Sequence, residues 1–167
     1  FISVRMLSLP EDRRTDAGAL AQALQETGSA LPRAISCWAR PALPPLNFNA
    51  GHIVWRMQFA TQQDALGAAH SPQWQTHIAP VLRSCSEVNG VGYYSTRKGL
   101  RAGGAGIWRA LVFRVMPHGF PDRVRDLEAA LLMMPKYIRT IRSWALNSVA
   151  TSHGATPYSH VWEQEFD

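Results

Sequence analysis

The sequence has few lysines, few cysteines and no long hydrophobic run. Its 17 basic residues comprise 15 arginines and two lysines, and they are scattered singly except at Arg13-Arg14 and in the segment 97–101. A face that binds nucleic acid needs clustered positive charge, so the net charge of +5 indicates an ordinary solvated surface. No apolar run approaches the roughly 20 residues that cross a bilayer. We therefore expect neither a nucleic-acid partner nor a membrane partner.

The scarcity of cysteine indicates the cellular compartment of the protein, and other missing motifs indicate whether it binds a metal or a cofactor. Only Cys37 and Cys85 are present, which is too few for a dense disulfide framework and is typical of reduced thiols in the cytoplasm. No HxxxH, CxxC or carboxylate cluster supplies a metal site, and the glycine-rich stretch 102–106 lacks the lysine of a phosphate-binding loop. The sequence therefore predicts a cytoplasmic protein without a metal site and without a cofactor.

What the sequence does contain is an internal repeat. The segments RAISCWARP (33–41) and RTIRSWALN (139–147) match at an offset of 106 residues. The segments IVWRMQFAT (53–61) and HVWEQEFD (160–167) match at an offset of 107. In each copy a strand-like run and a helix-like run precede the first of these segments. Such self-similarity predicts two structural units of one kind.

Both copies have the order strand, helix, strand, strand, and the first continues with a second helix, broken near Pro72 and Pro80, and a fourth strand. The βαββαβ order is the ferredoxin-like arrangement, in which both helices cover one face of an antiparallel sheet. We therefore predict an α+β protein of two tandem ferredoxin-like units whose sheets face each other, as in a dimeric α/β-barrel. The predicted limits are a complete first unit at 1–96, a linker at 97–106 and a second unit at 107–167.

The second unit stops after its third strand. Its last segment, PYSHVWEQEFD (157–167), corresponds to a strand that is followed by a helix in the first copy. A three-stranded sheet with half of its helical cover would expose much apolar surface. We interpret this βαββ unit as truncated, and a genuinely shortened unit is the alternative.

Four segments together resemble the stress-responsive dimeric α/β-barrel (Dabb) family. LVFRVMP (111–117), IRSWALN (141–147) and PYSHVWEQEFD resemble its first three strands, and HSPQWQTHIAPVL (70–82) resembles its second helix. The related antibiotic-biosynthesis monooxygenases have a similar helix. The resemblance implies a barrel cavity for a small apolar or aromatic ligand and includes cyclases that work without a cofactor. It leaves open whether the protein forms a homo-oligomer.

The strand at 53–59 has one strongly apolar side. Alternation places four large side chains together there, and burying each is worth about 1.5–3 kcal/mol. Because the helices are expected to cover the opposite face of the sheet, we predict that this row faces the barrel interior. The row consists of Ile53, Trp55, Met57 and Phe59.

The matching row of the second copy is more polar. His160 replaces Ile53 and Gln164 replaces Met57, and buried polar groups need a partner or a ligand. In the family's cyclases, which the sequence resembles, a histidine at this position lines the cavity. We predict that His160 is the catalytic acid–base residue and that Trp162 forms an aromatic wall. The alternative is a strand-end histidine bonded to backbone or water.

Further substrate-binding candidates come from both copies. Tyr158 would lie at the rim, and Arg109 could bind a carboxylate or phenolate through its planar guanidinium. The resemblance places a Tyr/His pair on the family's second helix, but Ala68 and Trp74 occupy those positions in the first copy, and neither can transfer a proton. The predicted substrate-binding set is Tyr158, Trp162, Gln164, Arg109, Trp55, Met57, His70 and Trp74.

These features lead to three functional hypotheses. The first is a cofactor-free lyase, cyclase or isomerase that acts on a small aromatic or polyketide-like molecule by histidine acid–base chemistry. The second is a non-catalytic stress-associated barrel that binds apolar ligands or assembles into oligomers. The third is a cofactor-free monooxygenase of the related barrel family.

Overall fold

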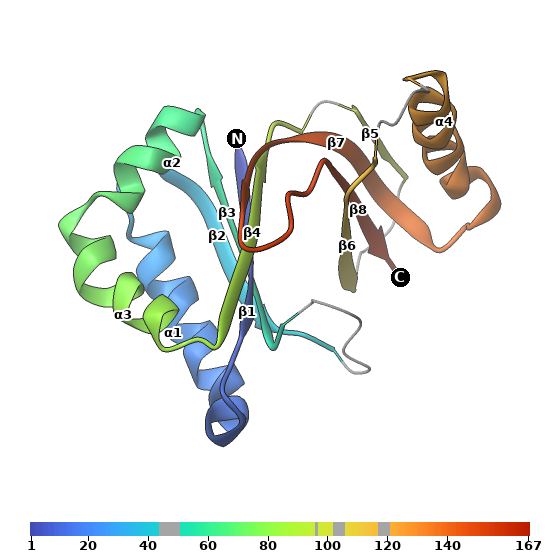
Figure 1. The fold of residues 1–167 in the computed structure, drawn as a ribbon. Helices are drawn as coiled ribbons and strands as arrows, with labels where there is room; N and C mark the ends of the chain where they lie inside the picture. The colour runs from blue at the N-terminus through green and yellow to red at the C-terminus, as the bar shows by residue number, and fades with distance from the viewer. Residues whose placement is uncertain (44–50, 96, 102–105, 117–120) are drawn as a thin grey trace. The chain divides into compact units, whose positions relative to one another are not determined.

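The computed structural model describes residues 1–43, 51–95, 97–101, 106–116 and 121–167 (Figure 1). The chain divides into two compact units. Unit 1 comprises Phe1–Gly92 with Thr151–Thr156, and unit 2 comprises Tyr93–Ala150 with Pro157–Asp167. No helix of the described residues is long and apolar enough to cross a membrane.

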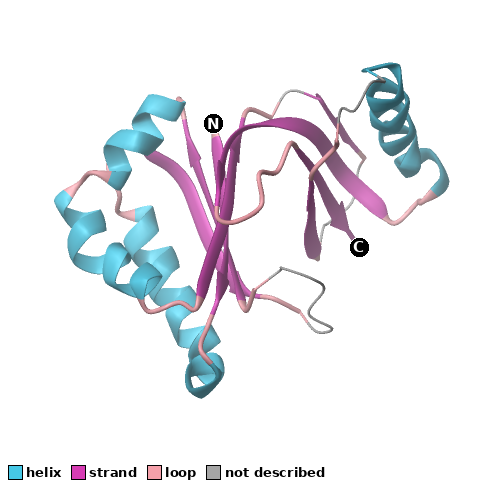
Figure 2. Cartoon of the chain, in the orientation of Figure 1, coloured by secondary structure: helices cyan, strands magenta, loops and turns pink. Residues whose placement is uncertain are grey.

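Unit 1 has the predicted βαββαβ order, and each helix-forming segment lies on one face of its sheet (Figure 2). The sheet has the strand order β2-β3-β1-β4, and β3 pairs antiparallel with both β1 and β2. The strands are β1 (Ile2–Ser8), β2 (Ala34–Pro41), β3 (Ile53–Phe59) and β4 (Glu87–Tyr93). The helices are the 3-10 helix η1 (Glu11–Asp16), α1 (Ala17–Ser29), α2 (Gln62–Ala69), the π-helical turn η2 (Trp74–Ile78) and α3 (Ala79–Arg83).

Local signals explain where these helices begin and break. Thr61 caps α2, because its hydroxyl accepts the backbone N–H of Asp64 at 3.1 Å, a bond that satisfies one of the free donors at a helix start. The predicted break near Pro72 is confirmed, since α2 ends at Ala69. No break occurs at Pro80, which lies in the first turn of α3, where proline is tolerated.

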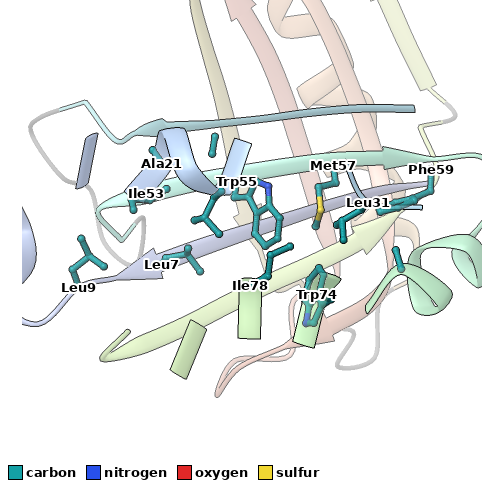
Figure 3. Close-up of a cluster of buried hydrophobic side chains, with 13 residues drawn as sticks. Leu7, Leu9, Ala21, Leu31, Ile53, Trp55, Met57, Phe59, Trp74 and Ile78 are labelled. Carbon is teal, nitrogen blue, oxygen red and sulfur yellow. The ribbon is translucent and has the colours of Figure 1, made fainter. Parts of the chain in front are cut away.

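The apolar row of β3 faces the helices and forms the core of unit 1 (Figure 3). Trp55 is fully buried among Leu24 of α1, Trp74 and Ile78 of η2. The rings of Trp55 and Trp74 stack with centroids 5.5 Å apart. The prediction that this row faces a barrel interior is therefore wrong: the helices cover the more apolar face of the sheet, because this face holds the larger side chains. The cluster is completed by Leu7, Leu9, Ala21, Leu31, Ala39, Ile53, Met57, Phe59 and Ala68.

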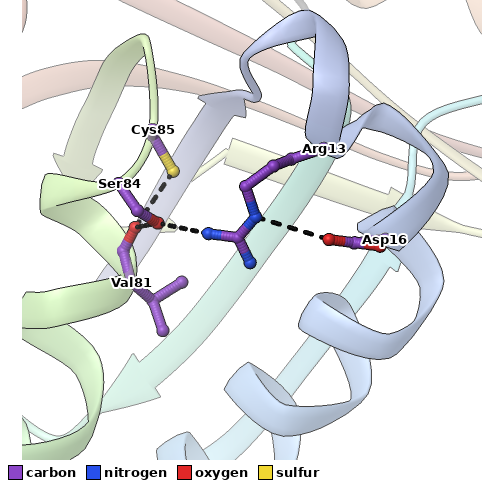
Figure 4. Close-up of polar contacts among 5 residues, drawn as sticks. All are labelled: Arg13, Asp16, Val81, Ser84 and Cys85. Atoms are coloured by element: carbon purple, nitrogen blue, oxygen red, sulfur yellow. Dashed lines mark hydrogen bonds and ion pairs between the residues drawn. The ribbon is translucent and has the colours of Figure 1, made fainter.

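A polar cluster joins η1 to the end of α3 (Figure 4). The guanidinium of Arg13 donates to Oγ of Ser84 at 3.1 Å and pairs with Asp16 at 3.3 Å. Ser84 and Cys85 both donate to the carbonyl oxygen of Val81, at 2.8 and 3.3 Å. These bonds add to the one that the backbone N–H of Ser84 makes to the same carbonyl oxygen at 3.1 Å, at the last turn of α3, where carbonyls lack helical partners.

Unit 2 repeats the order strand, helix, strand, strand. Its sheet is ordered β5-β7-β8-β6, in which β5 pairs antiparallel with β7, β7 with β8, and β8 with β6. The segment predicted as an unstructured linker begins with a strand, because residues 97–100 pair with β7; residues 102–105 of that segment lie outside the described residues. The elements are β5 (Arg97–Leu100), β6 (Ile107–Phe113), α4 (Pro121–Tyr137), β7 (Ile141–His153) and β8 (His160–Phe166).

Pro135 lies inside α4 and does not end it. The helix continues to Tyr137. Arg101 secures this end, since its guanidinium donates to the carbonyl oxygen of Pro135 and lies 5.5 Å from the ring centroid of Trp144. A cation near the last carbonyls of a helix stabilises that helix end.

The two units share a β-bulge at the same place, which shows how they align. The register of β2 against β3 shifts between Ala34 and Ser36, and that of β7 against β8 shifts between Ile141 and Ser143. The shift in β7 lies 107 residues after the shift in β2. The offset of 106 predicted between these two strands is therefore wrong by one residue. A one-residue slip reverses the face of every side chain.

This alignment separates two tryptophans that the sequence had matched. Trp144 pairs with Gln164 on the row of β8 that corresponds to the buried row of β3, whereas Trp38 pairs with Arg56 on the opposite face. The residue equivalent to Trp144 is therefore Cys37. The predicted limits of the two units and the truncation of the second remain predictions.

Candidate functional site

The polar row of β8 is directed toward the helix α4. His160, Trp162 and Gln164 lie on one face of the strand because side chains alternate, and His160 makes a hydrogen bond with Glu128 of α4. All three are buried, with relative exposures of 8%, 1% and 1%. The helix-facing side of the unit 2 sheet, and not a barrel interior, therefore holds the candidate site.

Each ring nitrogen of His160 has a polar neighbour. Nε2 lies 3.3 Å from Oε1 of Glu128, and Nδ1 lies 2.8 Å from Oγ of Ser159. The imidazole also stacks on the ring of Phe113, with centroids 5.3 Å apart. Only 10% of the His160 side chain and 16% of the Glu128 side chain are exposed. Electrostatic interactions are stronger at such shielded positions than in water, so the carboxylate firmly orients the ring.

This arrangement can take up a proton without leaving a polar group unpaired. A neutral His160 that donates Nε2–H to Glu128 accepts the hydroxyl of Ser159 at Nδ1. When Nδ1 is protonated it donates to Oγ of Ser159, and the hydroxyl can turn to the carbonyl oxygen of Phe113, 3.4 Å away. In both states Oγ accepts the backbone N–H of Val115 at 2.7 Å. Proton uptake therefore requires only the rotation of one hydroxyl.

The same contacts argue against acyl transfer through Ser159. In a serine hydrolase the nucleophile contacts Nε2 of the histidine and the carboxylate contacts Nδ1. Here the carboxylate of Glu128 is at Nε2 and the serine is at Nδ1. The hydroxyl is also held by the backbone of Val115. The geometry suits proton transfer.

Two buried N–H donors on the same row of β8 as His160 have no hydrogen-bond acceptor among the described residues. They are Nε1 of Trp162 and Nε2 of Gln164. An unpaired buried donor destabilises a fold by about 1–3 kcal/mol. Such an exception to hydrogen-bond pairing needs a specific explanation, and a functional role is one such explanation.

The repeat explains how one of these donors lost its acceptor. In unit 1 the indole N–H of Trp55 donates to Sγ of Cys37 at 3.2 Å. The residue equivalent to Cys37 in unit 2 is Trp144, as the matching bulges show. Its indole ring offers no comparable acceptor, so the N–H of Trp162 is left without one.

The structure brings some of the other predicted residues to this face. Arg109 pairs with Gln164 across β6 and β8, so the two side chains share the helix-facing side, and Arg109 is exposed. Tyr158 is partly buried and lies two residues before His160, in the loop that enters β8. That both contact a substrate remains a prediction.

The remaining predicted residues belong to unit 1. Trp55, Met57 and Trp74 pack in its apolar core with exposures of 0%, 2% and 7%. His70 follows α2, is exposed, and its Nδ1 lies 2.7 Å from the carbonyl oxygen of Leu66. The structure gives these four residues roles in packing and in the end of a helix, and their binding of substrate remains a prediction.

Sequence reasoning missed Glu128, Ser159 and Phe113. Glu128 carried a signal that could have been used. It lies on the same stripe of α4 as Val124, Leu131 and Pro135, which recur at helical spacing and are all partly or fully buried. A carboxylate on the apolar stripe of an amphipathic helix needs a partner inside the protein.

No cluster of three or more metal-ligating side chains occurs in the part of the chain that the structure describes.

No protein-family model and no curated protein matches the sequence. Solved structures do match. An anthrone oxidase-like protein is 12% identical, with a TM-score of 0.70, over 99% of this chain and 72% of that chain. The chain therefore shares a ferredoxin-like α+β fold with that protein.

Two monooxygenase-like proteins share this fold. The one from Lactobacillus acidophilus is 6% identical with a TM-score of 0.55, over 99% of this chain and 75% of that chain. The one from Fusobacterium nucleatum is 7% identical with a TM-score of 0.57, over 99% of this chain and 74% of that chain. The likeness shows a shared fold, and the resemblance to the Dabb family and its cyclases remains a prediction.

Proposed function

We propose that this protein is a small-molecule enzyme of the barrel superfamily in which His160 and Glu128 together accept a proton from an aromatic, weakly acidic substrate. The observation that carries the proposal is the buried imidazole with a carboxylate at one nitrogen and a reorientable hydroxyl at the other. General acid–base groups of this kind contribute about 10²–10⁴-fold to a rate.

The unpaired donors on the same row as His160 have a role in the proposed reaction. Removal of a proton from a phenol or an activated CH₂ group places negative charge on a substrate oxygen. The N–H groups of Trp162 and Gln164 can stabilise such an oxyanion, and one donor of this type is worth about 10²–10³ in turnover. The substrate oxygen would in turn satisfy donors that the fold leaves unpaired.

We infer that molecular oxygen is the second substrate, because the similar structures include an anthrone oxidase-like protein and monooxygenase-like proteins. In the balanced reaction a CH₂ group and O₂ give a carbonyl group and water. His160 and Glu128 would take the first proton, and the resulting carbanion would be the electron donor to oxygen. The enzyme itself would need no bound cofactor for this step.

The test is oxygen consumption with anthrone as the probe substrate. His160→Leu replaces the imidazole by an apolar side chain of similar size and should lower turnover at least 100-fold. Glu128→Gln keeps a hydrogen-bond acceptor for Nε2 and should lower it at least tenfold. His77→Ala removes an exposed histidine of unit 1 and should leave turnover within twofold.

The same assay separates the alternatives. If the protein converts a polyketide-like substrate under nitrogen and the conversion depends on His160, the result would favour a lyase or cyclase over an oxidase. The proton transfer would be the same. Saturable binding of anthrone without any conversion would favour the non-catalytic, ligand-binding hypothesis. Equal turnover in wild type and His160→Leu would refute the assignment of the site.

A further inference from the structure

Unit 1 contains an arginine whose surroundings the proposed reaction does not explain. Arg5 is on β1 and pairs with Trp55 of β3, so its side chain lies on the helix-facing side of the sheet. Its guanidinium carbon is 5.1 Å from the ring centroid of Trp74. Trp74 in turn stacks on Trp55. Two tryptophans and the guanidinium therefore form one stack that ends at Arg5.

Arg5 has no carboxylate partner. All twelve Asp and Glu residues of the chain lie in the segments that the structure describes, and none forms an ion pair with Arg5. Its Nε atom is fully buried and has no hydrogen-bond acceptor among the described residues. Arginine is rarely placed in such a position unless it is paired, because removing a charged group from water is costly.

The neighbours of Arg5 do not supply the missing anion. His153 lies in the segment Thr151–Thr156 of the same unit, and burial, with the charge of Arg5, lowers the pKa of His153. Burial likewise lowers the pKa of Arg5. Gly90 of β4 makes room for the arginine stem, since a Cβ there would be 3.4 Å from Cγ of Arg5 and 3.0 Å from the carbonyl oxygen of Val4. The guanidinium of Arg5 therefore lies beside a histidine that favours its neutral form, and no carboxylate pairs with it.

We propose that Arg5 binds the carboxylate of a small organic acid. Trp74 occupies one flat side of the guanidinium, which leaves the in-plane N–H groups as the donors. Those groups match the two oxygens of a carboxylate. The ligand would supply the negative charge that offsets Arg5. The site rests on contacts within unit 1 and does not depend on the reaction proposed for His160.

Calorimetric titration with benzoate tests this site, with benzamide as the uncharged analogue of the same shape. Wild type should bind benzoate saturably and benzamide at least tenfold more weakly. Arg5→Met, which keeps a long apolar stem, should raise the Kd for benzoate at least tenfold. Arg5→Lys keeps the charge without the planar fork and should raise it at least threefold. Arg14→Met, at an exposed arginine of η1, should change it less than twofold.

Several results would overturn the proposal. They are an absence of saturable benzoate binding by wild type, equal affinity for benzamide, and unchanged affinity in Arg5→Met. Inorganic phosphate that binds as tightly as benzoate would exclude selectivity for carboxylates. Benzoate binding that is lost in His160→Leu but kept in Arg5→Met would place the ligand in unit 2. The Tm of Arg5→Met should equal or exceed that of wild type, and a fall of more than 5 °C would mean that Arg5 is a structural residue.

Discussion

Replacing Gln164 by methionine gives β8 the residue that occupies the equivalent position of β3, Met57. The Nε2 atom of Gln164 is buried without an acceptor among the described residues, and the side chain is 1% exposed. An unpaired buried donor destabilises by about 1–3 kcal/mol, and methionine fills a similar volume without that penalty. We therefore expect Gln164→Met to raise the free energy of unfolding by about 1–3 kcal/mol.

The same substitution should lower activity. It removes one of the two donors proposed to stabilise the substrate oxyanion, so turnover of anthrone should fall at least tenfold. A gain of 1–3 kcal/mol corresponds to a rise in Tm of roughly 2–12 °C for a chain of this size. Urea denaturation followed by circular dichroism, with oxygen consumption measured on the same preparations, gives both quantities.

Met57→Gln is the matched control. Met57 is 2% exposed in the apolar core of unit 1, so an amide there loses apolar burial and gains an unpaired group. The free energy of unfolding should fall by at least about 2 kcal/mol. Opposite signs for the two substitutions would show that the two rows differ in function. If Gln164→Met were destabilising, or stabilising with full activity, the reasoning about this donor would be refuted.

Three further substitutions test other contacts. Thr61→Ala removes the cap of α2 and should lower the free energy of unfolding by about 1 kcal/mol in urea denaturation. The hydrogen bonds from Arg33 and Thr61 lower the pKa of Asp64. The stabilisation of the fold by this carboxylate is therefore present above the unfolded pKa of about 3.9 and is lost as pH falls through the lower folded value. Asp64→Asn should weaken the acid dependence of Tm below about pH 4. Arg101→Met removes the bond to Pro135 and the contact with Trp144 and should cost about 1–3 kcal/mol in urea denaturation; an unchanged value would show that Arg101 does not secure α4.

The repeat was predictable from sequence because chemical patterns survive in short segments. The matching strands β3 and β8 were found from shared Val, Trp and Phe positions, and the structure places both between two antiparallel neighbours. The polar replacements at His160 and Gln164 were also visible, since the aligned strand provides the apolar reference. What a one-dimensional alignment could not show was the bulge that displaces Trp144 by one residue relative to Trp38.

The direction of the apolar rows was predicted wrongly for a physical reason. Alternation shows that Ile53, Trp55 and Met57 share a side, but both faces of a ferredoxin-like sheet are covered in a barrel, and either cover can bury them. The choice depends on which face the helices reach. Sequence periodicity alone does not contain that information.

Glu128 illustrates the same limit for the site. It is 32 residues from His160 along the chain, on a different element, and only the packing of α4 against the sheet brings the carboxylate within 3.3 Å of Nε2. The hydroxyl of Ser159 contacts Nδ1 of His160 and accepts the backbone N–H of Val115. Both contacts depend on how the strand ends meet. No residue pattern marks such bonds in advance.

By itself, then, the sequence determined the duplicated α+β units, the strands that correspond, and the unusual polarity of β8, because these follow from local periodicity and from comparison of the two copies. The tertiary structure alone decided that this polar row faces a helix, that His160 meets Glu128, and that Arg5 has no acidic partner. Contacts of this kind depend on the distances between elements that are remote in the chain, and those distances are set by packing.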